Sequence, residues 1–224
     1  MKPIVGIFAH PDDEVFGPGG TLAKFAQEGR DVYLISVTNG DAGMNSSGKA
    51  GDLGKIRREE MQASAKILGI KEVFFLEYKD GTLSNNLYHE IAGKIQAILE
   101  KLQPEIILTM EPRGVSGHLD HIAVSMISSY VFERMPAIKE IWYYALTEEF
   151  RAGRPPYFIY FPPGYKVTEI NKTVSIQSVW EKKVAAMHQH KTQAHDMEKL
   201  LGQFMKFPKE ENFLIAERPI EDTE

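Results

Sequence analysis

The sequence predicts an α/β fold in which helices cover both faces of a mostly parallel sheet. Short apolar runs rich in Val, Ile and Phe alternate along the chain with amphipathic stretches of helical period, which is the pattern of parallel strands joined by crossover helices. The chain shows no internal repeat, no low-complexity tract and no linker. At about 150 residues per domain, its length predicts one domain over residues 1–224.

The first half of the chain contains four apolar runs that predict strands, with helices between them. A helix is recognised by apolar residues on one face, such as Ile91, Ile95 and Leu99, and by a Gly or Pro just after its end. The expected elements are strands at 4–9, 32–37, 73–76 and 105–109, and helices at 17–28, 55–68 and 87–102. The segment 39–54 is rich in Gly, Ser, Asn and Asp, so it predicts a long loop, and such loops are often functional.

The second half continues the alternation and then becomes less regular. We expect a helix at 118–131, a strand at 140–146, an irregular proline-rich stretch at 151–167, a helical stretch at 178–205 and a last strand at 213–216. Ligands of such sheets bind beyond the carboxyl ends of the strands. Residues that directly follow a strand are therefore the first candidates for a functional site.

Composition narrows the function. The chain has 26 basic and 31 acidic residues, a net charge of −5, which argues against a nucleic-acid-binding protein. No apolar run approaches the roughly 18 residues of a membrane span, and the N-terminal apolar stretch is too short for a signal peptide, so we expect a cytoplasmic protein. Cysteine is absent, so any metal must be held by His, Asp or Glu. No G-x-G-x-x-G motif follows the first strand, which argues against a dinucleotide site.

Two polar clusters follow the first and fourth predicted strands. The first is His-Pro-Asp-Asp-Glu at 10–14, and the second is Gly-His-Leu-Asp-His at 117–121. Taken singly, they could be a polar turn and half-buried helix residues. Both should lie at the same edge of one sheet, and a spacing of three puts His118 and His121 on one side of a helical turn. Together they favour a metal site.

The chemistry of these residue types fits metal-assisted hydrolysis. A catalytic zinc ion takes imidazole and carboxylate ligands and keeps one position for water. Asp12 and Asp13 are adjacent and point in different directions in a turn, so one can bind the metal while the other takes a proton from water. A further His can protonate the leaving amine or stabilise an oxyanion. Asp120 is placed to orient an imidazole.

The sequence resembles the PIG-L/LmbE-like N-acetylglucosaminyl deacetylases. Residues 9–14 read AHPDDE and residues 118–121 read HLDH, which match the family's AHPDDE and HxDH motifs, although many members have Pro in place of Leu119. Weaker matches are TNGDAG at 38–43, RREE at 57–60 followed by Leu68-Gly69, and HKTQ at 190–193. The matches extend from about residue 4 to residue 193 in the family's order.

The resemblance implies a Rossmann-like fold without a dinucleotide, one zinc ion per chain, and hydrolysis of an N-acetyl group on a small amino-sugar conjugate. By residue, it implies that the zinc ligands are His10, Asp13 and His121, that the general base is Asp12, that the general acid or oxyanion stabiliser is His118, and that Asp120 orients His118. Members often form small rings, so a homo-oligomer is also expected.

Several residues carry two interpretations. By resemblance Arg57 contacts the substrate, whereas its neighbours also suit a charged helix face, which is the interpretation preferred for Arg58. Asp41 either lines the pocket or makes a turn, and His190 is expected in the substrate pocket. We expect segments 41–54 and 150–168 to recognise the group that is attached to the sugar of the substrate. The alternatives are an amidase for another N-acyl amine, a non-catalytic metal- or sugar-binding protein, and a different metal such as iron, cobalt or nickel.

Overall fold

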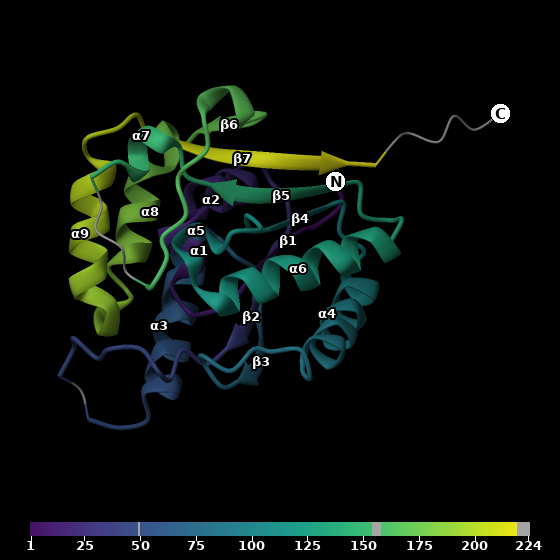
Figure 1. The fold of residues 1–224 in the computed structure, drawn as a ribbon, viewed down its shortest axis with the longest axis horizontal. Helices are drawn as coiled ribbons and strands as arrows, with labels where there is room; N and C mark the ends of the chain where they lie inside the picture. The colour runs from purple at the N-terminus through teal and green to yellow at the C-terminus, as the bar shows by residue number, and fades with distance from the viewer. Residues whose placement is uncertain (49, 154–157, 219–224) are drawn as a thin grey trace.

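The central element is a sheet with the strand order β3-β2-β1-β4-β5-β7-β6, in a computed structural model that describes residues 1–48, 50–153 and 158–218 (Figure 1). The strands within these residues are β1 (Ile4–Phe8), β2 (Val32–Thr38), β3 (Glu72–Tyr78), β4 (Ile106–Met110), β5 (Glu140–Ala145), β6 (Lys172–Ser175) and β7 (Glu210–Glu217). The first five pair in parallel, and β7 and β6 add an antiparallel end to the sheet.

Helices pack on both faces of this sheet. They are α1 (Asp13–Phe16), α2 (Gly19–Gln27), α3 (Leu53–Leu68), α4 (Tyr88–Leu102), α5 (Gly114–Gly117), α6 (Leu119–Arg134), α7 (Glu148–Arg151), α8 (Trp180–Met187) and α9 (Ala194–Phe204), with short 3-10 turns η1 (Val167–Glu169), η2 (Gln177–Val179) and η3 (Lys191–Gln193). Side chains alternate along β1: Val5 and Ile7 join one core with α4 and α6. Ile4 and Phe8 join a second core with α2, α3, α8 and α9. The predicted α/β class is confirmed.

Two sequence predictions of individual elements are wrong, and one element was not predicted. The helical stretch at 178–205 is two helices, because the chain tightens after Met187 into turns that place His190 and Thr192 in the interior. The helix expected at 17–28 begins at Gly19 and follows the separate turn α1. The short edge strand β6 was not predicted, because its four residues are mostly exposed and lack an apolar pattern. Residues 154–157 of the expected proline-rich stretch lie outside the described residues.

The strand order decides where the two polar clusters lie. β1 and β4 are neighbours, with Ile4 opposite Ile106 and Gly6 opposite Leu108. The chain leaves β1 toward β2 on one side and leaves β4 toward β5 on the other, so their carboxyl ends form the topological switch point at which such sheets bind ligands. Among the helices of the described residues, none has both the length and the apolar composition needed to cross a membrane.

Candidate metal centre

The structure brings the two polar clusters together at this switch point. Ring centroids are 4.5 Å apart for His10 and His118, and 5.1 Å apart for His10 and His121. Asp13, within the first cluster, is the first residue of α1, and His121 lies in the first turn of α6. His10, Asp12, Asp13 and Asp120 are buried, whereas His118 and His121 are half-buried.

Three donor atoms converge in this cluster. His10 Nδ1 and His121 Nε2 are 3.1 Å apart. One carboxylate oxygen of Asp13 lies 3.1 Å from His121 Nε2, and the other lies 3.5 Å from His10 Nδ1. These residues form one of the groups in the described chain whose ligand atoms are close enough to share a metal ion.

The remaining ring nitrogens show why this set fits a cation. His121 Nδ1 is 3.0 Å from the Gly114 carbonyl oxygen, which can only accept, so Nδ1 carries the hydrogen. His10 Nε2 is 3.0 Å from Asp80 Oδ1, so it also carries a hydrogen. In the neutral rings, the two facing nitrogens are therefore both unprotonated. Two such nitrogens beside a carboxylate are a donor set that catalytic zinc ions and other divalent metal ions use.

Charges around the set also favour a cation. Burial alone raises the pKa of Asp13, but the neighbouring His121 and His10 outweigh it and hold this pKa well below its ordinary value. Burial lowers the pKa of His10, but its contacts with Asp120, Asp13 and Asp80 raise it well above the ordinary value. The surrounding carboxylates therefore favour positive charge at the place where the donor atoms meet, and a bound cation would supply that charge while both facing nitrogens stay unprotonated.

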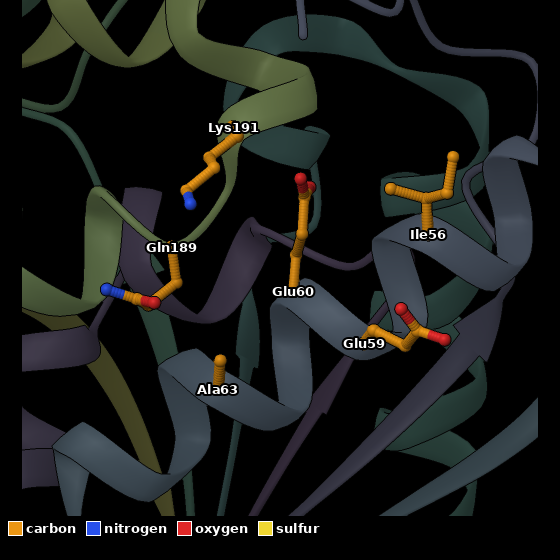
Figure 2. A pocket seen from close by; sticks show the side chains of 6 residues that line it. All are labelled: Ile56, Glu59, Glu60, Ala63, Gln189 and Lys191. Carbon is orange, nitrogen blue, oxygen red and sulfur yellow. The ribbon is translucent and has the colours of Figure 1, made fainter. Parts of the chain in front are cut away.

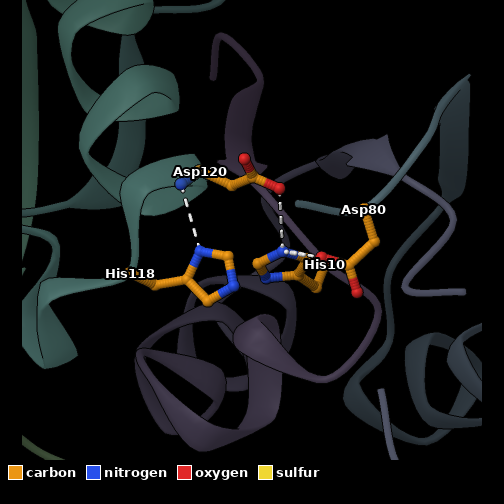
Figure 3. A group of neighbouring side chains, drawn as sticks. All are labelled: His10, Asp80, His118 and Asp120. Atoms are coloured by element: carbon orange, nitrogen blue, oxygen red, sulfur yellow. Dashed lines mark hydrogen bonds and ion pairs between the residues drawn. The ribbon is translucent and has the colours of Figure 1, made fainter. Parts of the chain in front are cut away.

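A second group of possible ligands overlaps the first (Figure 3). It contains His10, Asp80, His118 and Asp120, and it shares His10 with the first set. Here the hydrogen on His10 Nε2 already lies toward two carboxylate oxygens, at 3.0 Å for Asp80 and 3.4 Å for Asp120. Asp80 and Asp120 therefore accept from His10 on the side of the ring opposite the first donor set. This arrangement fixes the tautomer of a metal-binding His.

Asp80 was missed by sequence reasoning. It lies between β3 and α4 and precedes Gly81, so the sequence shows only an Asp-Gly turn signal. Its 8% exposure and its contact with His10 follow from the path of the chain across the sheet edge. Asp41, predicted at the pocket or in a turn, is exposed, and its Oδ1 accepts the Asp80 backbone N–H at 2.9 Å. Asp41 thereby supports the Asp80 turn.

We expect Asp80→Ala to weaken metal binding, tested with added zinc, by about 10- to 100-fold, the range for loss of a carboxylate that holds a metal-binding His. Competition with a chromophoric chelator measures the dissociation constant. Glu77→Ala is the control, because it removes an exposed carboxylate that pairs with Arg58 instead. Equal zinc affinity in the Asp80 variant and the parent would contradict the support assigned to Asp80.

The structure corrects the prediction that the Asp120 carboxylate holds His118. That carboxylate accepts the backbone N–H groups of Gly81 at 2.8 Å and Leu83 at 3.1 Å, and it faces His10. Asp120 contacts His118 through its own backbone N–H, which donates to His118 Nδ1 at 3.0 Å. The reason is that His118 is the N-cap of α6, and an N-cap side chain accepts from the first turn.

This N-cap hydrogen bond determines which ring nitrogen of His118 carries the hydrogen. Because Nδ1 accepts, the neutral ring carries its hydrogen on Nε2. Burial, followed by the nearby His10 and His121, lowers the pKa of His118 to about 4. The ring is thus a neutral hydrogen-bond donor beside the donor set of His10, Asp13 and His121.

Asp12 lies beside the same set and can accept a proton. It is 8% exposed, and its Oδ2 accepts from Arg57 Nη2 at 2.9 Å. Burial raises the pKa of Asp12, the Arg57 charge lowers it, and the neighbouring Asp13 raises it again, so that the resulting pKa is about 6. A carboxylate with such a pKa is suited to general base catalysis near neutral pH.

Arg57 lies beneath Asp12 instead of on a charged helix face. It is 3% exposed, and it also donates to the carbonyl oxygens of Gly40 at 2.7 Å and Pro11 at 2.5 Å. Gly40 has φ +65, and a Cβ there would lie 2.5 Å from Arg57 Nη1, so glycine makes this approach possible. Substrate contact by Arg57 stays a prediction, and its observed contacts position Asp12. Arg58 does lie on the charged face, with its guanidinium 4.4 Å from the ring centre of Phe75.

His190 was expected in the substrate pocket, and the structure places it in the interior. It is 1% exposed, and its Nε2 lies 2.8 Å from Glu14 Oε1. Nearby, a surface pocket of about 150 Å³ lies between α3 and the turn after α8 (Figure 2). Its lining residues are Ile56, Glu59, Glu60, Ala63, Gln189 and Lys191, a set that includes neither His190 nor the predicted metal ligands.

The chain is similar in sequence to a family model and to two deacetylases. Residues 5–131 match the family model described as PIG-L: GlcNAc-PI de-N-acetylase. The diacetylchitobiose deacetylase of Thermococcus kodakarensis is 30% identical over 197 residues, which cover 86% of this chain and 70% of that protein. The 1D-myo-inositol 2-acetamido-2-deoxy-alpha-D-glucopyranoside deacetylase of Mycobacteroides abscessus is 26% identical over 223 residues, which cover 84% of this chain and 80% of that protein.

Among solved structures, the 4-carboxy-2-hydroxymuconate hydratase GalB of Pseudomonas putida KT2440 superimposes with a TM-score of 0.76. The match covers 100% of this chain and 99% of the hydratase at 18% identity. At that identity the likeness is evidence for the fold alone, since one fold carries many chemistries.

Proposed function

The chain belongs to the PIG-L family of GlcNAc-PI de-N-acetylases, and we propose that it is a zinc-dependent hydrolase that removes the acetyl group from a small N-acetylglucosamine-containing substrate. One observation carries this proposal. The unprotonated nitrogens of His10 and His121 and the carboxylate of Asp13 converge beside Asp12, a buried carboxylate suited to accept a proton. The two curated relatives named above are both deacetylases of N-acetylated sugars, which supports the substrate class.

In this proposal His10, Asp13 and His121 hold one zinc ion. A bound zinc ion supplies a Lewis acid that acidifies water and polarises an amide carbonyl. Asp12 removes a proton from the attacking water, whose oxygen forms a bond to the acetyl carbon. The C–N bond then breaks as the proton passes from Asp12 to the leaving nitrogen, and acetic acid and the free amine depart and ionise in water to acetate and an ammonium group.

In the same proposal, His118 stabilises the oxyanion that develops on the carbonyl oxygen of the acetyl group. Its Nδ1 accepts the Asp120 N–H, so its Nε2–H is available to donate. A neutral imidazole whose pKa is lowered to about 4 is a poor source of a whole proton near pH 7 but a good hydrogen-bond donor. This supports oxyanion stabilisation over general acid catalysis, and it leaves proton delivery to Asp12.

The test is acetate release from a panel of N-acetylglucosaminides by protein stripped of metal and then reloaded with zinc. The panel includes N,N′-diacetylchitobiose and an inositol conjugate, the sugars named for the two relatives. We expect release only after reloading, and the rank order identifies the preferred aglycone. One bound zinc per chain without release from any member would overturn the amino-sugar assignment and favour another N-acyl amine or a binding role.

A further inference from the structure

The backbone of Asp12 adopts a conformation that needs outside support. Its φ of 118° and ψ of −24° lie on the left-handed side, which residues other than Gly rarely occupy. Such a residue is disfavoured unless its surroundings hold it in place. Arg57 holds the carboxylate but not the backbone N–H, which donates to Glu14 Oε2 at 3.0 Å.

Glu14 has no exposed surface and uses both of its oxygens. Oε2 accepts from Asp12, while Oε1 accepts from Ser64 Oγ at 2.8 Å and lies 2.8 Å from His190 Nε2. These partners come from α3 and from the turn after α8. A buried carboxylate is stable only when such donors surround it, so the partners decide where Glu14 lies.

The side chain of His190 has one polar contact in the part of the chain that the structure describes. Its Nε2 donates to Glu14, whereas its buried Nδ1 has no hydrogen-bond partner there. At 1% exposure it cannot reach a substrate directly. His190 also lies beyond residues 5–131, the part of the chain that matches the family model.

We propose that Glu14 and His190 are positioning residues for Asp12: His190 holds the Glu14 carboxylate, and Glu14 holds the Asp12 backbone in the orientation that aims its carboxylate at the reacting water. The inference rests on the proposed function for the role of Asp12 as base. It gives the buried His190, in the turn between α8 and η3, a role in catalysis without contact to substrate.

The kinetic test compares two variants of His190 in the zinc-loaded protein, with the most active panel member as substrate. We expect His190→Leu to lower kcat by about 10- to 100-fold, because small displacements of a reacting group cost about this much. KM and zinc affinity should not change. His190→Gln keeps a donor at similar reach and should restore kcat to within about 3-fold of the parent.

His188→Leu is the matched control. His188 lies two residues before His190 in the same turn and its side chain is exposed, so the same substitution there removes no contact to Glu14. His190→Leu should lower kcat, whereas His188→Leu should leave kcat at the parental value. A lower Tm with parental kcat in His190→Leu would show a merely structural role and overturn the proposal, as would equal losses of kcat in the two variants.

A double-mutant cycle tests whether the effect passes through Asp12. In an Asp12→Asn background, His190→Leu should cause no further loss of the residual turnover, since residues that act as a unit are not additive. A full additional 10- to 100-fold loss in that background would contradict the inference.

A crystal structure of zinc-loaded His190→Leu, and of Glu14→Ala where it folds, gives a result that does not depend on activity. We expect Asp12 to leave its positive φ and its Oδ2 to move out of hydrogen-bond range of Arg57 Nη2. An unchanged Asp12 would overturn the positioning role. A displaced Asp12 in a protein whose parent releases no acetate would retain that role and reject the deacetylase function.

Discussion

Asp12→Asn is expected to lower kcat for acetate release by about 10²- to 10⁴-fold, the range of a general base, while one zinc ion per chain stays bound. Asn has the same shape, accepts positive φ more readily than most residues, and keeps an oxygen for Arg57. The substitution therefore removes the ability to take a proton, together with the negative charge that faces Arg57, and changes the shape little. The acid limb of the parent's plot of kcat against pH should disappear in the variant.

Metal analysis and thermal melting accompany this measurement. The zinc content should not change, whereas Tm should fall, because the buried Arg57 loses its charged partner. Asp52→Asn is the control for the chemistry of the substitution. Asp52 caps α3 by accepting the Lys55 N–H, a role that Asn fills equally well, so kcat should match the parent. A near-parental kcat in Asp12→Asn would mean that the proton goes elsewhere.

The donor set was predictable because it depends on two local patterns and one general property of parallel sheets. His10, Asp13 and His121 follow buried strands, and the carboxyl ends of neighbouring strands meet. Asp80 was not predictable in this way. It follows β3, which is two strands away from β1 at the edge of the sheet, and its approach to His10 depends on how the loop returns across that edge.

The role of Asp120 shows a different limit. Its position two residues after His118 suggested a contact between its carboxylate and the imidazole. Because α6 begins between the two residues, His118 caps the helix and its ring accepts the backbone N–H of Asp120 instead. The backbone N–H of Asp120 faces His118, which frees its carboxylate for His10 and the loop at 81–83. Spacing alone cannot distinguish these cases, because the answer depends on where the helix begins.

The second large effect is expected from Lys183→Met, which should lower the free energy of unfolding by about 3–5 kcal/mol. Lys183 is fully buried, and its Nζ pairs with Glu211 Oε1 at 2.6 Å and donates to the Gly17 carbonyl at 2.8 Å. Glu211 also accepts the N–H groups of Gly20 and Thr21, at 2.9 and 2.7 Å. Without the ammonium, a carboxylate remains buried with no opposite charge.

At roughly 2–4 °C per kcal/mol for a chain of this size, Tm should fall by about 6–20 °C. Lys182→Met is the matched control. Lys182 is the neighbour of Lys183 on α8, but its side chain is exposed, so the same substitution there should change the free energy of unfolding by less than about 0.5 kcal/mol. Urea unfolding of the zinc-saturated proteins gives both free energies.

Adding Glu211→Gln to Lys183→Met tests the cause. The neutral amide can still accept one of the two N–H groups of Gly20 and Thr21, and it removes the unpaired charge. The double variant should therefore lose less stability than the sum of the single variants, with a coupling of about 0.5–3 kcal/mol. Additive losses would mean that packing around α2 and α8, and not the charge of Glu211, accounts for the effect of Lys183. Coupled losses would show that the charge of Glu211 accounts for the effect, and that the ion pair between α8 and β7 stabilises the fold beside the turn after α1, where Lys183 also contacts Gly17.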